Sequence, residues 1–227
     1  LGILSFRDLE STRRQWTPLA DYLSRQVPGH RFVVRPYFLD DLSAAVAAGQ
    51  VDFVLTQPEH YVLLRSAHRL AAVATLAPRV GDGGTPRFGG VIVARAGRSD
   101  LRALTDLRDK VVVATHANSL GSYRLQQWTL HQAGVRLPDD IAGLRFTGQP
   151  QDRVIDEILA GRGDVGFVRT GLIESLIDEG KLAADALQVI NPQTAPNFPL
   201  RLSTELFPEW PFSTLPQVPD DLARAVT

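Results

Sequence analysis

Short apolar runs alternate with segments of helical periodicity along most of this 227-residue chain. The order strand, helix, strand, helix, strand starts once at Ile3 and again at Val111. The third strand of each series follows a helix end, a glycine and an aspartate, so that residues 48–54 resemble residues 160–166. A turn of this kind is common in α/β proteins, but the matching order of elements favours two lobes of similar build. The expected fold class is therefore α/β, with largely parallel sheets.

The expected elements can be placed from periodicity, caps and turn residues. Strands are predicted at 2–6, 30–37, 51–56, 70–76, 88–93, 111–113, 144–147, 164–168 and 187–190. Helices are predicted after a cap at Ser11 or Thr12, at 42–48 after Asp40, from Pro58, from Ser119 to Gly134, and at 154–159, 172–177 and 220–226. A polar loop is expected at 81–86. Ligands of open α/β sheets bind beyond the carboxyl ends of the strands, so the loops that follow the strands carry the candidate site.

Composition excludes several classes of function. The hydrophobic fraction of 44% and charged fraction of 22% are those of an ordinary globular protein. A net charge of −1 without a basic run argues against a nucleic-acid partner. No apolar run is long enough to span a membrane, and the absence of cysteine excludes thiol nucleophiles and thiolate metal sites. Leu1 is not a natural start, so we expect a piece of a longer chain.

The clearest candidate for ligand binding follows the strand at 111–113. There the chain passes through small polar residues into a helix near Ser119. Backbone N–H groups at a helix start, together with the positive end of the helix dipole, favour an anion. The alternative is an ordinary connection in which Ser119 is only an N-cap.

Two other strand ends offer polar side chains. Thr56 and Gln57 precede Pro58 and mirror the Ser119 turn in the other lobe, either as ligand contacts or as local caps. Tyr61, one turn further on, is either a ligand contact or a core residue. Arg169 directly follows a strand, where a guanidinium suits an oxyanion, although an exposed surface arginine is the alternative.

Nothing in the sequence assembles a catalytic centre, a metal site or a cofactor site. The five histidines are scattered and form no metal motif, and neither a Gly-x-Ser-x-Gly elbow nor a Walker loop is present. Asp52 and Asp164 follow glycine stops and are expected to fix turns. Trp210 is expected to pack the tail against the first lobe. The expectation is a non-enzymatic chain without metal or cofactor.

The chain resembles periplasmic solute-binding proteins of the phosphonate-binding type, and in particular the ligand-sensing regions of sensor histidine kinases built on that fold, such as tetrathionate sensors. The matching segments lie at 49–56, 88–92, 104–110, 119–123, 146–148, 168–171 and 208–212. The segments 119–123, 168–171 and 208–212 look more specific to the sensor branch. The resemblance implies a two-lobe periplasmic binding protein type II fold with a hinge and an interlobe ligand cleft. It also implies one lobe of residues 1–93 with 191–227, and another of 94–190.

Site residues follow from the same resemblance by position. Ser119, Leu120 and Gly121 would offer donors to an oxyanion, with Ser122 and Tyr123 in the same segment. The other lobe would present Tyr37, Thr56, Gln57 and Phe88. Relatives often have Ser-His after the glycine that matches Gly148, whereas this chain has Gln149 and Pro150, and proline has no N–H to donate. That contact is therefore either lost or made differently, and Gln149 is the candidate ligand-binding residue at this position.

The expected function is the extracytoplasmic, periplasmic sensing domain of a sensor histidine kinase that binds a small anion, with the kinase region beyond residue 227. The alternative is a free solute-binding protein of an ABC transporter for phosphonate-like or other oxyanions. An enzyme on the same fold would need a catalytic pair, and an effector module of a transcription regulator would need an upstream helix-turn-helix. Neither nucleic acid nor direct membrane contact is expected.

Overall fold

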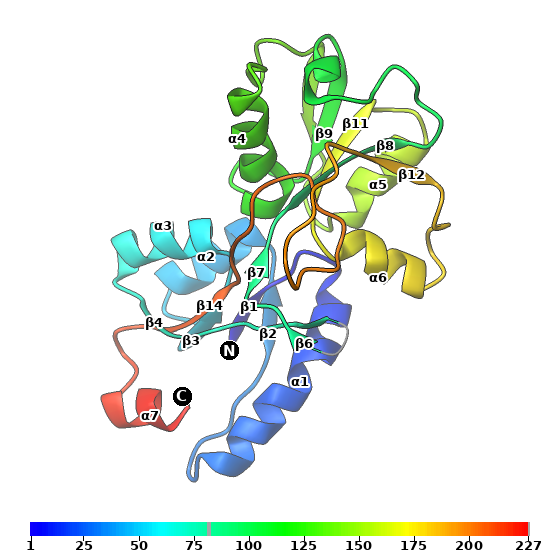
Figure 1. Ribbon diagram of the computed structural model, residues 1–227. Coiled ribbons are helices and arrows are strands. Elements are labelled where there is room, and N and C mark those ends of the chain that lie inside the picture. Colours follow the sequence, from blue (N-terminus) through cyan, green and yellow to red (C-terminus); the bar gives the residue numbers. More distant parts are fainter. Residues whose placement is uncertain (81–82, 227) are drawn as a thin grey trace. The chain divides into compact units, whose positions relative to one another are not determined.

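The computed structural model describes residues 1–80 and 83–226, so Gly81 and Asp82 of the expected polar loop lie outside the described residues. Contacts divide the chain into two compact units (Figure 1). The first comprises Leu1–Leu76 and the C-terminal segment from Glu209, and the second comprises Ala77–Pro208. The sequence places the boundaries after 93 and after 190, whereas the second unit begins at Ala77 and ends at Pro208. The segments 77–93 and 191–208 thus belong to the second unit, where Ser203 and Thr204 hydrogen-bond to the strand that begins at Gly90.

The first unit is built on one five-stranded sheet in the order β2-β1-β3-β14-β4. Its β1 pairs in parallel with β2 and β3, while β14 pairs antiparallel with β3 and β4. The strands are β1 (Gly2–Leu4), β2 (Arg35–Tyr37), β3 (Phe53–Leu55), β4 (Ala71–Thr75) and β14 (Pro211–Thr214). The helices are α1 (Leu9–Gln26), α2 (Leu39–Ala47), α3 (Pro58–His68) and α7 (Asp220–Ala225).

The second unit carries a five-stranded sheet in the order β10-β9-β11-β8-β12. Its main strands are β8 (Gly90–Arg95), β9 (Val111–Ala114), β10 (Gly143–Phe146), β11 (Val165–Arg169) and β12 (Leu187–Ile190). Its helical segments are η1 (Leu104–Leu107), η2 (Leu120–Arg124), α4 (Leu125–Gln132), α5 (Asp152–Leu159) and α6 (Leu172–Asp178). Two short ribbons pair β5 (Arg79–Val80) with β6 (Gly83–Gly84), and β7 (Arg87–Phe88) with β13 (Phe207–Pro208).

The two sheets have the same strand order, which confirms the prediction of two lobes of similar build. In each sheet three parallel strands stand in the order second, first, third, and an antiparallel strand from outside the series, β14 or β8, follows. The sheets are therefore mixed, but only β14 or β8 runs against the other strands of its sheet, in keeping with the expectation of largely parallel sheets. A sequence pattern does not give the direction of such a strand, because its partners are far away in the chain.

Several element ends differ from the sequence expectation. Asp8, rather than Ser11 or Thr12, caps α1, since the amide of Ser11 donates to Asp8 Oδ1 over 2.7 Å. The strand expected at 30–37 shortens to β2, and the strand expected at 88–93 is divided at Gly89 into β7 and β8. Trp210 packs as expected, with its ring edge-to-face against Phe6 at a centroid distance of 6.0 Å in the first unit.

A hydrophobic core cluster of the second unit lies around β8, β9 and β11. It includes Ile92, Leu107, Val112, Leu130 and Phe167, each fully or almost fully buried. Burial on this scale is the main stabilising contribution to such a domain. It leaves the ends of β9 and β11 as rigid supports for the loops that follow them.

Candidate functional site

The connection from β9 to α4 is a tightly bonded turn. Ser119 has an extended backbone, its own amide donates to His116 O, and its side chain accepts from the amide of Ser122 over 3.3 Å. Ser119 thus caps the helical segment as the plain-cap interpretation says. The same capping fixes the orientation of the first-turn amides, which lack acceptors inside a helix.

Ser122 is part of the framework under this turn. Its side chain is fully buried, and its hydroxyl donates to Phe167 O over 2.6 Å. The same oxygen accepts from the amide of Thr115 over 3.1 Å and lies 2.6 Å from the Thr115 hydroxyl. Ser122 therefore ties β9, η2 and β11 together, and a direct ligand contact by its hydroxyl stays a prediction.

Gln126, which the sequence did not single out, connects the turn to the sheet. The side chain is fully buried, and its Nε2 lies 2.8 Å from Gly121 O, 3.1 Å from Val168 O and 3.4 Å from Val91 O. Through these three carbonyl oxygens the Gln126 side chain connects the helical segment to β8 and β11. A glutamine one turn after a helix start carries no signal that distinguishes it from a surface residue.

Gly121, Arg169 and Phe88 are brought together beneath the turn. The guanidinium carbon of Arg169 lies 5.1 Å from the centre of the Phe88 ring, within cation–π range. A Cβ added at Gly121 would lie 2.8 Å from Arg169 Cβ and 3.1 Å from Phe88 Cε2. Glycine is thus required for this close approach. The backbone of Arg169 therefore packs directly against the helical turn at Gly121, and its guanidinium lies over the Phe88 ring.

Arg169 is 8% exposed and is therefore a buried arginine, which removes the alternative of a surface residue. Its amide donates to Gln151 Oε1 over 3.1 Å, and Gln151 is itself buried. Gln149 lies partly exposed two residues earlier, before a cis peptide bond to Pro150. The segment 149–151, which departs from the pattern of the relatives, thus supports Arg169 through Gln151. The sequence does not single out Gln151. A ligand contact by Gln149 stays a prediction.

Tyr123 and Leu120 complete the predicted set in this turn. Tyr123 belongs to the buried core, packs edge-to-face on Phe146 at 5.2 Å, and accepts from Gln127 Nε2 at its hydroxyl. Burial raises the pKa of the Tyr123 hydroxyl, so this group stays protonated at neutral pH. Leu120 is partly exposed at the start of η2.

In the first unit, Thr56 belongs to a buried chain of polar groups. Its hydroxyl lies 2.8 Å from His60 Nδ1, and His60 Nε2 lies 2.8 Å from the Ser43 hydroxyl. Thr56 is fully buried and His60 is 4% exposed. The chain links the end of β3 to α2 and α3, so it fixes the orientation of the Thr56 side chain. The sequence alone does not distinguish His60 from the other four histidines.

The remaining predicted residues of the first unit do not form a described cluster. Gln57 is buried at the start of α3, and Tyr61 accepts from the amide of Ala72 at its hydroxyl over 3.3 Å. Tyr37 ends β2, and its carbonyl accepts from the amide of Ser5. A ligand contact by Tyr37, Thr56, Gln57 or Tyr61 stays a prediction.

The chemistry available at the Gly121, Arg169 and Phe88 cluster is anion recognition. In the described ranges, 1–80 and 83–226, no three side chains of histidine, aspartate or glutamate group together as ligands for a metal ion. Those same ranges contain no helix whose length and hydropathy would allow it to cross a bilayer. A guanidinium is suited to two parallel hydrogen bonds with a carboxylate, phosphonate or sulfonate.

Comparison with known proteins places the chain in a family. The family model of the phosphonate ABC transporter periplasmic substrate-binding protein matches residues 1–227. The tetrathionate sensor histidine kinase TtrS of Salmonella typhimurium is 36% identical over 228 residues. That alignment covers 100% of this chain, which spans only 38% of the length of TtrS.

Solved structures agree on the fold. A binding-protein component of the phosphonate transporter of Pseudomonas aeruginosa is similar with a TM-score of 0.75 at 16% identity, covering 99% of this chain and 70% of that one. PhnD1 of Prochlorococcus marinus in complex with methylphosphonate has a TM-score of 0.73 at 14% identity, covering 99% and 80%. Both are periplasmic binding proteins with two α/β lobes, the type II fold predicted for this chain. The chain belongs to the family of phosphonate-type periplasmic substrate-binding proteins.

Proposed function

We propose that this chain is the extracytoplasmic ligand-sensing domain of a sensor histidine kinase and that it binds a small anion. The observation that carries the proposal is the 36% identity with a tetrathionate sensor kinase over the whole chain. The kinase region, on this proposal, lies in a part of the protein beyond residue 227. The periplasm is the proposed location, in keeping with the family.

The anion is proposed to bind at Arg169, with Gly121 and the first-turn amides as further donors. Arg169 is buried and stacked on Phe88, so little side-chain entropy remains to be lost when a ligand binds. Low exposure also strengthens its electrostatic attraction for an oxyanion. Among the members of the predicted set in the second unit, Arg169 is the one permanent positive charge in contact with Gly121.

A differential thermal unfolding screen tests this proposal. The chain is heated with tetrathionate, thiosulfate, sulfate, methylphosphonate, phosphate and small carboxylates, and with chloride salts at equal ionic strength as the control. A ligand at a hundred times its Kd stabilises the folded state by about 2.7 kcal/mol, which raises Tm by several degrees. A stabilising anion supports the proposal, and a flat response to all of them contradicts it.

A free solute-binding protein is the second candidate, favoured by the description of the matching family. The two candidates differ outside the present sequence. Reading the whole open reading frame decides between them, because a sensor kinase continues into a transmembrane segment and a kinase region. A reading frame that ends directly after the binding domain would favour the transporter role.

A further inference from the structure

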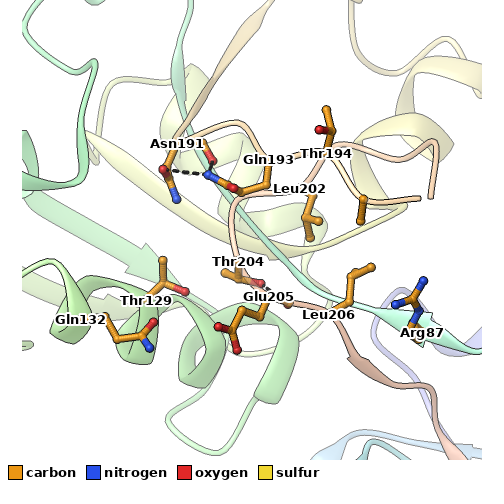
Figure 2. A pocket seen from close by; sticks show the side chains of 11 residues that line it. Arg87, Thr129, Gln132, Asn191, Gln193, Thr194, Leu202, Thr204, Glu205 and Leu206 are labelled. Atoms are coloured by element: carbon orange, nitrogen blue, oxygen red, sulfur yellow. Dashed lines mark hydrogen bonds between the residues drawn. The ribbon is translucent and has the colours of Figure 1, made fainter. Parts of the chain in front are cut away.

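A pocket of about 520 Å³ lies in the second unit, apart from the cluster of Gly121, Arg169 and Phe88. It is an open pocket lined by the loop between β12 and β13, the C-terminal part of α4 and one residue of β7 (Figure 2). Its lining comprises Arg87, Thr129, Gln132, Asn191, Gln193, Thr194, Ala195, Leu202, Thr204, Glu205 and Leu206. None of these residues belongs to the Gly121, Arg169 and Phe88 cluster. A pocket of this size accommodates a small organic molecule.

The lining contains one cation, one carboxylate and several neutral polar groups. Within the part of the chain that the structure describes, Glu205 forms no ion pair, and Arg87 makes only a long hydrogen bond of 3.4 Å to Pro196 O. Figure 2 shows the carboxylate of Glu205 and the guanidinium of Arg87 as separate ends, with Leu206 between them. The amides of Gln132 and Gln193 and the hydroxyl of Thr194 add neutral donors and acceptors.

The walls of this pocket are held in place by hydrogen bonds to the sheet. Thr204 accepts from the amide of Gly90 over 2.9 Å, and its hydroxyl donates to Glu205 O over 2.8 Å. Asn191 has a left-handed backbone with φ of 54°, and its Nδ2 donates to Ser203 O over 2.9 Å. Gln193 is bound to Asn191 Oδ1 in turn. The loop is therefore a preformed wall, as a binding site requires.

The pocket also adjoins the anion cluster through one strand. Neighbouring residues of a strand point to opposite faces, so Arg87 faces the pocket while Phe88 is buried against Arg169. Phe88 and Arg87 pair with Phe207 and Pro208, which directly follow Glu205 and Leu206. A molecule in the pocket would contact Arg87 of β7 and Leu206, the residue directly before β13.

We propose that this pocket is a second solute site, distinct from the anion site, and that it takes a small zwitterion of the amino-acid type. The ammonium group binds the Glu205 carboxylate and the carboxylate group binds the Arg87 guanidinium. The amides of Gln132 and Gln193 and the Thr194 hydroxyl contact the remaining polar groups. Opposite charges at separate ends of one pocket select a zwitterion over a simple anion, which Glu205 repels.

Amide chemical-shift mapping of the 227-residue chain tests the site. L-serine and L-glutamine serve as zwitterionic probes, sorbitol as a neutral polyol and sulfate as a simple anion. The expected result is saturable shifts for the zwitterions at residues 129–132 and 191–206, with Kd on the order of 1 mM because the site is open. Glu205→Gln and Arg87→Gln each weaken binding by about tenfold, whereas the exposed control Asp185→Asn has no effect.

The proposal is separable from that of the anion site. In an Arg169→Ala variant the zwitterion shifts at 191–206 persist, whether or not any anion binds at the first site. Shifts that move to residues 119–124, or that vanish with Arg169→Ala and survive Glu205→Gln, would overturn the second site. Equal shifts with sorbitol would overturn the assignment to a zwitterion. The absence of shifts at 129–132 and 191–206 with every probe would overturn the second site itself.

Discussion

Gly121 shows how a single residue sets the geometry of the candidate site. The resemblance placed it among the ligand donors, but the structure gives it a further role, because its missing side chain lets Arg169 and Phe88 approach the helical turn. Its backbone φ lies outside the left-handed region, so conformational freedom is not the reason for glycine here. A side chain at position 121 would collide with Arg169 and Phe88, and it would not strain the backbone.

The variant Gly121→Ala is expected to weaken anion binding by about tenfold or more. The new Cβ would stand 2.8 Å from Arg169 Cβ, closer than such atoms approach, so the arginine must shift. Gly143→Ala is the matched control in the same unit, since nothing lies within 4 Å of a Cβ added there. Calorimetric titration of both variants checks the prediction, and equal affinities would show that the position of Arg169 does not matter.

Ser122→Ala is expected to act on stability. It removes a hydroxyl that donates to Phe167 O and accepts from the amide of Thr115, leaving a buried amide and carbonyl without that partner. The expected loss is about 1–3 kcal/mol in the free energy of unfolding, measured in urea. The exposed Ser99→Ala serves as control. A variant as stable as the original chain, with binding lost, would instead make Ser122 a ligand contact.

At the scale of elements, the entry to β9 is fixed by a group of charges. Arg98 bridges Asp100 at 2.7 Å and Asp164 at 2.9 Å, and Lys110 lies 2.9 Å from Asp100. Asp164 Oδ2 also accepts from the amide of Val111, the first residue of β9. The sequence predicted that Asp164 fixes a turn, and these bonds agree with that role.

This group makes stability depend on pH. Burial opposes ionisation of Asp164, but the hydrogen bonds from Val111 and Arg98 outweigh it and keep the pKa of this carboxyl below its ordinary value. Hydrogen bonds from Arg98 and Lys110 likewise hold the pKa of Asp100 well below its ordinary value. A depressed pKa contributes stability that is present above the unfolded-state pKa, about 4, and is lost as pH falls through the folded-state pKa.

Asp164→Asn is therefore expected to lower the free energy of unfolding at pH 7 by about 1–2 kcal/mol. The difference in free energy of unfolding between the original chain and the variant should shrink below about pH 4, where Asp164 becomes protonated first in the unfolded chain and then, at lower pH, in the folded one. Urea unfolding at pH 7, 4 and 3 measures it. A difference that stays constant over this range would show that the charge of Asp164 contributes nothing.

Local signals in the sequence predicted much of the element order but not the long-range bonds. Apolar runs located β9, β11 and β12, and Pro58 located the start of α3. The break at Gly89 was missed because it depends on the approach of the 202–205 segment, whereas the N-cap of α1 at Asp8 is a local signal that the prediction placed three or four residues too late. The resemblance predicts Gly121 and Phe88 as site residues, and the position of Arg169 directly after a strand predicts the third. Gln126 and Gln151 were missed because their roles arise only from packing.

At the scale of the whole molecule, two units with the same strand order present strand ends with different chemistry. The second unit offers a buried guanidinium next to a helix start, while the first offers the hydroxyl of Thr56 in a chain with His60 and Ser43. Similar frameworks therefore support dissimilar surfaces. This difference explains why the internal sequence echo predicts the fold and not the ligand.

In the complete protein, the proposed sensor role predicts that a bound anion changes the activity of the attached kinase region. The ligand shifts that activity only by its difference in affinity for the two signalling states. Autophosphorylation of the full-length protein in membranes, with and without the stabilising anion, checks this prediction. An activity unaffected at saturating anion would favour the role of a binding protein without a signalling function.

The most direct test of the central claim is isothermal titration of the 227-residue chain and its Arg169→Ala variant with tetrathionate, methylphosphonate and the other anions of the thermal screen. The account predicts that at least one anion binds the original chain at a single site. It also predicts that Arg169→Ala weakens this binding by about a hundredfold while the variant keeps its fold, since a desolvated charge pair is lost. Unchanged affinity in Arg169→Ala, or no binding of any anion to the original chain, would contradict it.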